Sequence, residues 1–186
     1  MKRIVLIVLT VLFLTGCSSG GGEMKRALSL REKILSGSAC SFETVISADY
    51  ADKVYTFEMK CRMDRNGTMA FEVIMPETIS GVTGTVDYDS GKLTFNEDAL
   101  LFEVLADGEI TPVSAPWAMF TALKSGYIKG CGKQQDGLYM QIDDTYEDKA
   151  LTVDLYTDAQ DIPIRGEIIW EGRRVVSMDV KNFIIL

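Results

Sequence analysis

The segment from Val54 to Met63, Val-Tyr-Thr-Phe-Glu-Met-Lys-Cys-Arg-Met, alternates in character at almost every step. One set of alternate positions is apolar: Tyr55, Phe57, Met59, Cys61 and Met63. The set between them is polar: Thr56, Glu58, Lys60 and Arg62. Successive side chains of a strand point to opposite faces, so this pattern predicts a strand with one buried face and one face in water.

The same period of two extends along the chain in both directions. The segments Cys40 to Ala48 and Thr68 to Met75 flank the strand from Val54 to Met63. Asn66-Gly67, between that strand and the next, is a strong signal for a hairpin turn. Further strands are predicted at Gly81 to Tyr88, Lys92 to Phe95, Leu100 to Leu105, Gly137 to Ile142, Ala150 to Tyr156, Pro163 to Trp170 and Arg173 to Ile184. We therefore expect about 10 to 11 strands in an antiparallel meander.

Two segments have helical rather than alternating character. Met24 to Ser36 is amphipathic and is followed by Gly37, which suits a helix C-terminus. Trp117 to Lys124 interrupts the strands after two prolines. A long sheet with one apolar face must bury that face against another element, and curling around a helix does so. The expected fold is therefore mainly β (α+β): a strongly curved antiparallel half-barrel with an N-terminal helix and an inserted helix on its concave side. A closed lipocalin-like barrel usually has its main helix late in the chain, so the order favours the half-barrel.

The N-terminal residues predict a lipoprotein signal peptide over residues 1–16. Lys2 and Arg3 precede an uncharged apolar run, which ends at Leu14-Thr15-Gly16-Cys17. The run is shorter than the roughly 20 residues that cross a bilayer. We expect cleavage before Cys17, lipidation of the Cys17 thiol (diacylglyceryl and palmitate-type chains), and attachment to the extracytoplasmic face of the cell membrane. Residues 17–23 then form a flexible tether and residues 24–186 form one domain.

The charge balance limits the partners. The chain has 27 acidic and 19 basic residues, and removal of Lys2 and Arg3 leaves 17 − 27 = −10. No cluster of Lys or Arg interrupts this acidic sequence, so nucleic-acid binding is not expected. Membrane contact is expected from the lipid on Cys17 rather than from a basic patch.

The chain contains no histidine, which excludes a Ser-His-Asp or Cys-His nucleophile and any His-ligated zinc site. Carboxylates cluster at Asp143-Asp144 with Glu147-Asp148, and at Asp158 with Asp161. These lie in predicted turns, where acidic residues usually face water; calcium is the ion that they would suit. We expect no catalysis, no metal and no cofactor.

The cysteines leave two alternatives open. A hairpin register that pairs Ala48 with Lys53 places Cys40 opposite Cys61, and an exported protein could form a disulfide there. Alternatively both thiols are buried and reduced, and a slip of two residues pairs Phe42 with Cys61 instead. Cys131 is then a free thiol or the true partner of one of the others.

Methionine and aromatic residues gather at the apolar positions. Flexible thioethers accommodate irregular apolar ligands, so these side chains could line a cavity for an acyl chain. The predicted cavity residues are Phe57, Met59, Met63, Met69, Phe71, Met75, Trp117, Met119 and Phe120. The alternative is that the same side chains simply fill a core.

The order of a lead helix, a curled antiparallel meander, an inserted helix and closing strands, together with the lipobox Leu14-Thr15-Gly16-Cys17, resembles the LolA/LolB-like lipoprotein-carrier superfamily. The resemblance covers Met24 to Leu186. The superfamily includes lipobox-bearing lipoproteins of Gram-positive endospore formers, some of which are linked to sporulation or germination. It implies a hydrophobic concavity for acyl chains. A soluble shuttle is not itself anchored, so Cys17 departs from the periplasmic carriers and suggests a surface-fixed, receptor-like branch.

Two functions follow from these observations. The first is a membrane-anchored lipoprotein that binds a lipid or an acylated protein in the concavity without covalent chemistry. The second is a cell-envelope or spore-associated structural module with a solid core, no ligand and a protein partner on its acidic outer face or a sheet edge.

Overall fold

The computed structural model describes residues 21–50, 53–88, 90–95, 98–102, 105–106, 109–146 and 149–186. The predicted signal peptide and lipidated Cys17 lie outside these residues. Neither long helix of the described part is both long enough and apolar enough to cross a membrane.

Helix α2 (Gly21–Ser36) confirms the predicted lead helix and extends it by three residues toward the N-terminus. Ala27, Leu30 and Ile34 are buried, which is the spacing of one helical side. The Arg26 guanidinium binds the Asp161 carboxylate, with a nitrogen–oxygen distance of 2.6 Å, and so joins α2 to a turn far along the chain. The helix is thus an integral part of the fold.

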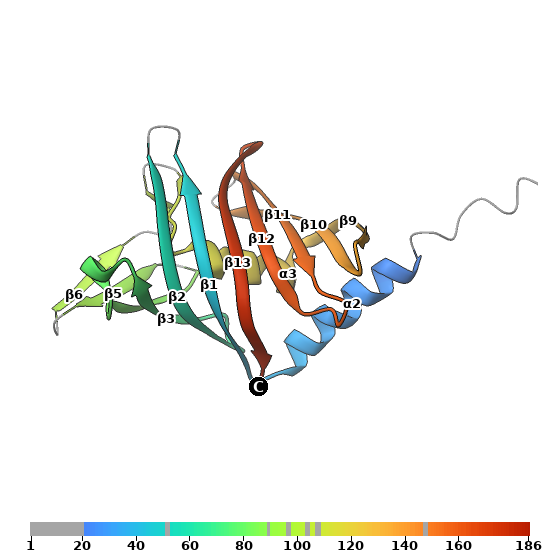
Figure 1. Cartoon of the computed structure of the whole chain (residues 1–186), viewed down its shortest axis with the longest axis horizontal. Helices are drawn as coiled ribbons and strands as arrows, with labels where there is room; N and C mark the ends of the chain where they lie inside the picture. The colour runs from blue at the N-terminus through green and yellow to red at the C-terminus, as the bar shows by residue number, and fades with distance from the viewer. Residues whose placement is uncertain are drawn as a thin grey trace, which may run out of the picture.

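Eleven described strands form one antiparallel sheet in the order β6-β5-β4-β3-β2-β1-β13-β12-β11-β10-β9, and β7 pairs with β8 separately. Their bounds are β1 Ala39–Asp49, β2 Val54–Asp64, β3 Met69–Met75, β4 Thr83–Val86, β5 Gly91–Phe95, β6 Asp98–Phe102, β7 Leu105–Ala106, β8 Glu109–Ile110, β9 Tyr127–Gln134, β10 Gly137–Tyr146, β11 Lys149–Thr157, β12 Pro163–Trp170 and β13 Arg173–Ile185. A short 3₁₀ helix, η1 (Glu77–Ile79), separates β3 from β4. The sheet is curled and open (Figure 1).

In the large sheet, strands that pair are also consecutive in the sequence, except at one seam, where β1 pairs with β13. The last strand, β13, lies between β1 and β12 and is antiparallel to both. Gly67, with a φ of +94°, follows Asn66 in the predicted β2–β3 turn, and glycine suits this left-handed conformation because it has no Cβ. Alternation along β1 buries every second residue from Cys40 to Ala48, which confirms the predicted inward and outward faces.

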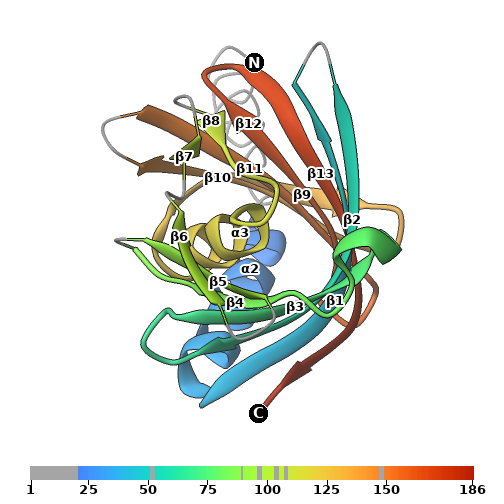
Figure 2. The same cartoon turned by 90° about the vertical axis from the view of Figure 1, so that its left-hand side faces the viewer.

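Helix α3 (Ala115–Ser125) lies inside the curl of the sheet, above α2 (Figure 2). It has Pro116 in its first turn, where a missing N–H costs nothing. Eight of its eleven residues are buried. The predicted fold, a curved antiparallel half-barrel with a lead helix and an inserted helix on the concave side, is therefore confirmed.

Two local expectations were wrong. Strand β9 was not predicted, because Gly130 and Gly132 obscure its alternation; pairing with β10 holds it in place. The β1–β2 register pairs Asp49 with Val54 rather than Ala48 with Lys53. The turn thus includes Lys53, and the whole ladder is shifted by two residues.

Candidate ligand site between the sheet and the inserted helix

Methionine and aromatic side chains on the concave side of the sheet form one buried core with the residues of α3. Most of the predicted cavity residues meet in this layer and are almost inaccessible to water. Those with exposed fractions of 4% or less are Met59, Met63, Met69, Phe71, Trp117, Met119 and Phe120. In the described residues this layer is a packed interface rather than an open concavity.

The other two predicted cavity residues are less buried. Met75 is 46% exposed, because the β2–β3 register shifts between Glu58 and Met59 and so places Met75 opposite the outward-facing Glu58. Phe57 is half-buried and stacks beside Tyr55 toward the β1–β2 turn, with ring centroids 6.4 Å apart. Met75 therefore lies outside the buried core, whereas Phe57 packs against it.

Aromatic rings and a glycine set how closely α3 approaches the sheet. The Phe120 ring lies 4.5 Å from that of Phe42 on β1 and 5.5 Å from that of Phe183 on β13, centroid to centroid. A Cβ at Gly166 of β12 would lie only 2.1 Å from the Met119 sulfur. Any larger side chain at Gly166 must therefore displace Met119 or the helix.

The polar contacts of α3 with other elements are at its two ends. Arg31 of α2 donates from Nε to the Leu123 carbonyl and from a terminal nitrogen to the Gly126 carbonyl, both over 2.7 Å. The Trp117 indole N–H donates to the Gly67 carbonyl, and the Lys124 ammonium donates to the Arg65 carbonyl. The middle of the helix is held by apolar packing alone among the described contacts.

An aromatic cluster spans the open side of the half-barrel. Tyr146 of β10 donates from its hydroxyl to the carbonyl of Tyr88, which follows β4. The Trp117 ring lies 5.9 Å from the Tyr146 ring and 6.4 Å from the Tyr88 ring. These three side chains connect the two ends of the sheet through α3.

Thr44 is the one buried side chain in the described residues whose polar atom lacks a hydrogen-bond partner. It lies on the inward face of β1, opposite Met59 of β2 and Val180 of β13, and is 1% exposed. A buried hydroxyl without a partner is costly, so its presence in an apolar layer calls for an explanation. No pattern in the sequence pointed to Thr44, Tyr88 or Tyr146, because only the fold places them at this layer and its open side.

The predicted Cys40–Cys61 disulfide is not present. The register places Cys61 opposite Phe42 and Cys40 opposite Met63, so the two cysteines are diagonal neighbours with free thiols. Burial raises the pKa of the Cys40 thiol to about 11 and also raises the pKa of Cys61. Cys131 on β9 is free as well and is partly exposed.

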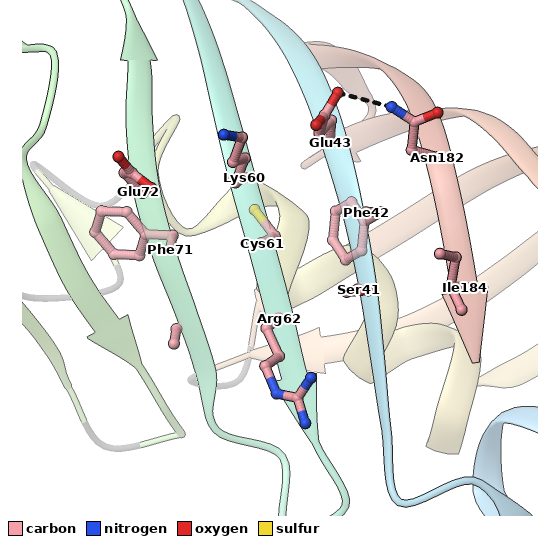
Figure 3. A pocket seen from close by; sticks show the side chains of 11 residues that line it. Ser41, Phe42, Glu43, Lys60, Cys61, Arg62, Phe71, Glu72, Asn182 and Ile184 are labelled. Atoms are coloured by element: carbon pink, nitrogen blue, oxygen red, sulfur yellow. Dashed lines mark hydrogen bonds between the residues drawn. The ribbon is translucent and has the colours of Figure 1, made fainter. Parts of the chain in front are cut away.

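The outward face of the same strands carries a surface hollow of about 440 Å³ (Figure 3). Opposite charges face one another in a row across it: Glu72, Lys60, Glu43 and Lys181 on β3, β2, β1 and β13. Asn182 donates a hydrogen bond to Glu43 over 2.9 Å (Figure 3). Of the predicted cavity residues, only Phe71 borders this hollow. It is distinct from the layer beneath α3.

The predicted acidic groups have structural partners. Asp161 binds Arg26, and Asp158 accepts backbone N–H groups of Gln160 and Ile162 in its own turn. Asp143 lies within β10, not in a turn, and contacts Lys129 and Thr152. Glu147 and Asp148 lie outside the described residues. No set of three His, Cys, Asp or Glu side chains in the described part is placed to hold a metal ion.

Comparisons with known proteins find similarity of fold. No family model and no curated protein sequence matches the chain. A LolA superfamily protein from Nitrosomonas europaea is 10% identical, with 86% of this chain and 93% of that chain covered and a TM-score of 0.45. A putative outer membrane lipoprotein-sorting protein domain from Vibrio parahaemolyticus is 6% identical, with 87% and 91% covered and a TM-score of 0.49. Lipoprotein LppX from Mycobacterium tuberculosis is 14% identical, with 87% and 93% covered and a TM-score of 0.40.

Proposed function

We propose that this chain is a membrane-anchored lipoprotein, lipidated on Cys17, that binds the acyl chain of a lipid or of an acylated protein between the curled sheet and α3. Binding involves no covalent chemistry. The observation that carries the proposal is the way α3 is seated: its apolar middle rests on thioether and aromatic side chains, and its polar contacts are confined to its ends. Such a helix can move away from the sheet without leaving polar groups unpaired in the core.

The unpartnered Thr44 hydroxyl supports the same reading. An acyl chain carries an ester, amide or carboxyl oxygen at one end, and Thr44 can donate to such an oxygen within an otherwise apolar layer. Flexible side chains such as Met59 and Met119 can repack around a chain of variable shape. The proposal requires α3 to move away from the sheet, because the described side chains between them are closely packed.

The test is native mass spectrometry of the chain from Ser18, purified from bacteria without detergent, followed by organic extraction. We expect co-purifying lipid, or uptake of added palmitate at one equivalent. Thr44→Val should weaken palmitate binding severalfold, whereas Thr152→Val on the outward face of β11 should not. A bare mass and no uptake of palmitate would refute the proposal.

A second function is favoured by one observation: the described concave side is filled, and the 440 Å³ hollow lies on the outward face. The chain would then be a cell-envelope or spore-associated module that contacts a protein through that face. Partner capture from envelope extracts that is lost in Lys60→Glu, together with no palmitate uptake, would select this function over the first.

A further inference from the structure

One side of α2 is apolar and exposed although it belongs to no described interface. Leu28 and Leu35 are 50% and 49% exposed and lie seven residues apart, which places them on the same side of the helix. Arg31, between them, holds the Leu123 and Gly126 carbonyls. The next residue, Tyr127, begins β9 and is 73% exposed. Two leucines and a tyrosine therefore lie at one edge of the molecule.

Basic side chains surround this edge although the chain as a whole is acidic. Arg65, from the β2–β3 turn, donates to the Ser36 and Gly37 carbonyls at the C-terminus of α2, and Lys124 donates to the Arg65 carbonyl. Residues 21–36 and 124–134 together hold seven Lys or Arg and two Glu. Of these, Arg26 is paired with Asp161 and Lys129 with Asp143. The sequence has no run of Lys or Arg, but the fold brings Arg65 and Lys124 beside α2 from segments that are far apart in sequence.

We propose that this edge, composed of Leu28, Leu35, Tyr127, Lys25, Arg65 and Lys124, rests on an anionic phospholipid bilayer and fixes the orientation of the domain on the membrane. Leucine and tyrosine side chains enter the headgroup region, and the basic side chains contact lipid phosphates. This proposal rests on the proposed function in one respect only, the lipid anchor on Cys17.

The length of the tether supports a bilayer as the occupant. Three residues separate Cys17 from Gly21, where α2 begins, so the two Cα atoms are at most about 14 Å apart in a fully extended chain. A lipid on Cys17 therefore keeps the N-terminus of α2 close to the membrane. Figure 1 shows α2 along one margin of the molecule, while the end of β1 and the start of β2 lie at the opposite margin. Since α3 ends beside this edge, a lipid that leaves the bilayer here meets the candidate ligand site directly.

The test measures which lysines the bilayer covers. The chain from Cys17, with Cys131→Ser so that Cys17 is the one accessible thiol, is coupled to a maleimide phospholipid in vesicles of 30% phosphatidylglycerol in phosphatidylcholine. Lysines are acetylated briefly and quantified by mass spectrometry, with the uncoupled protein as reference. We expect acetylation of Lys25 and Lys124 to fall at least threefold, while Lys53 and Lys92, both exposed and far from α2, stay unchanged.

Two comparisons make the test specific. Leu28→Glu with Leu35→Glu should abolish the protection, whereas Val54→Glu with Met75→Glu, at positions 66% and 46% exposed, should leave it intact. Equal acetylation of all four lysines on vesicles, or equal protection on pure phosphatidylcholine, would overturn the proposal. Protection of Lys25 and Lys124 in concentrated protein without vesicles would show that a second copy covers the edge, and would overturn it as well. A chemical linker replaces cellular lipidation and no fatty acid is added, so failure here is distinct from failure of the proposed function.

Discussion

The two faces of β1, β2, β3 and β13 are built from alternate residues of the same strands but differ in how they are held. On the concave face, Met59 and Phe71 are buried in the same apolar core as the residues of α3. On the outward face, Glu72, Lys60, Glu43 and Lys181 face one another in water. Exposed charge pairs contribute little to stability, whereas buried apolar area contributes much. The inward face therefore stabilises the fold, and the outward face mainly favours the correct register.

The largest difference between the faces should appear on truncation of a ring. Phe120→Ala removes the ring that contacts Phe42 and Phe183, and it should lower the free energy of unfolding by about 3–5 kcal/mol. Ile184→Ala on the outward face, 53% exposed, should cost about 0.5 kcal/mol or less. Urea titration followed by tryptophan fluorescence measures both. Similar losses at the two positions would mean that the inner layer is loosely packed.

Overpacking beneath α3 should be the next largest effect. Gly166→Val places new atoms where the Met119 thioether lies, so we expect a loss of about 1–3 kcal/mol. Adding Met119→Ala makes room and should recover part of that loss, although Met119→Ala alone is destabilising. The double-mutant cycle is read from the same urea titrations. Strict additivity of the two substitutions would contradict the close approach of α3 to β12.

Two buried threonines should respond in opposite directions. Thr44→Val replaces an unpartnered hydroxyl with a methyl group, so the ligand-free protein should gain about 1 kcal/mol. Thr157→Val removes the hydroxyl that accepts the Leu138 N–H and donates to the Asp158 carbonyl, and should lose about 1–3 kcal/mol. Thermal unfolding monitored by circular dichroism compares them. Destabilisation by Thr44→Val would show that its hydroxyl has a partner in solution.

The smallest effect is expected within the outward row of charges. Lys60→Ala leaves Glu43 and Glu72 without the cation between them and should cost about 0.5 kcal/mol, a loss that 0.5 M salt should largely remove. Urea titrations at low and high salt detect it. A loss above 2 kcal/mol, or one that salt does not change, would give the outward face a larger role in stability.

Periodicity predicted the strands and helices well because one-sided burial determines both. The segment Val54 to Met63 became β2 with its alternation intact, and Trp117 to Lys124 became the core of α3. The register could not be predicted, since a slip of two residues preserves the buried face and only the turn length decides it. For that reason two registers were left open: the pairing of Cys40 with Cys61 was wrong, and the alternative that pairs Phe42 with Cys61 is confirmed.

The residue types at the candidate site were predicted, but whether the concave side of the sheet is open or filled was not. Methionine and aromatic residues at inward positions indicated the layer, yet whether a helix fills a concavity depends on close fits such as Gly166 against Met119. Thr44 gave no sign in the sequence because a single threonine within a strand is ordinary. The basic edge was missed because Arg65 and Lys124 meet α2 only in the folded chain.

The central position of β13 determines when the fold can close. This strand joins β1, the first strand in the sequence, to β12, the strand that precedes it in the sequence, so each half of the sheet keeps an exposed strand edge until residues 173–185 arrive. In a chain that emerges N-terminus first, the last segment to appear is the one that seals the seam. Contacts between such distant residues slow folding, and the exposed edges of β1 and β12 are sites where another chain can add a strand meanwhile. Correct folding of this protein therefore depends on keeping those two edges apart from other chains until its final residues have emerged.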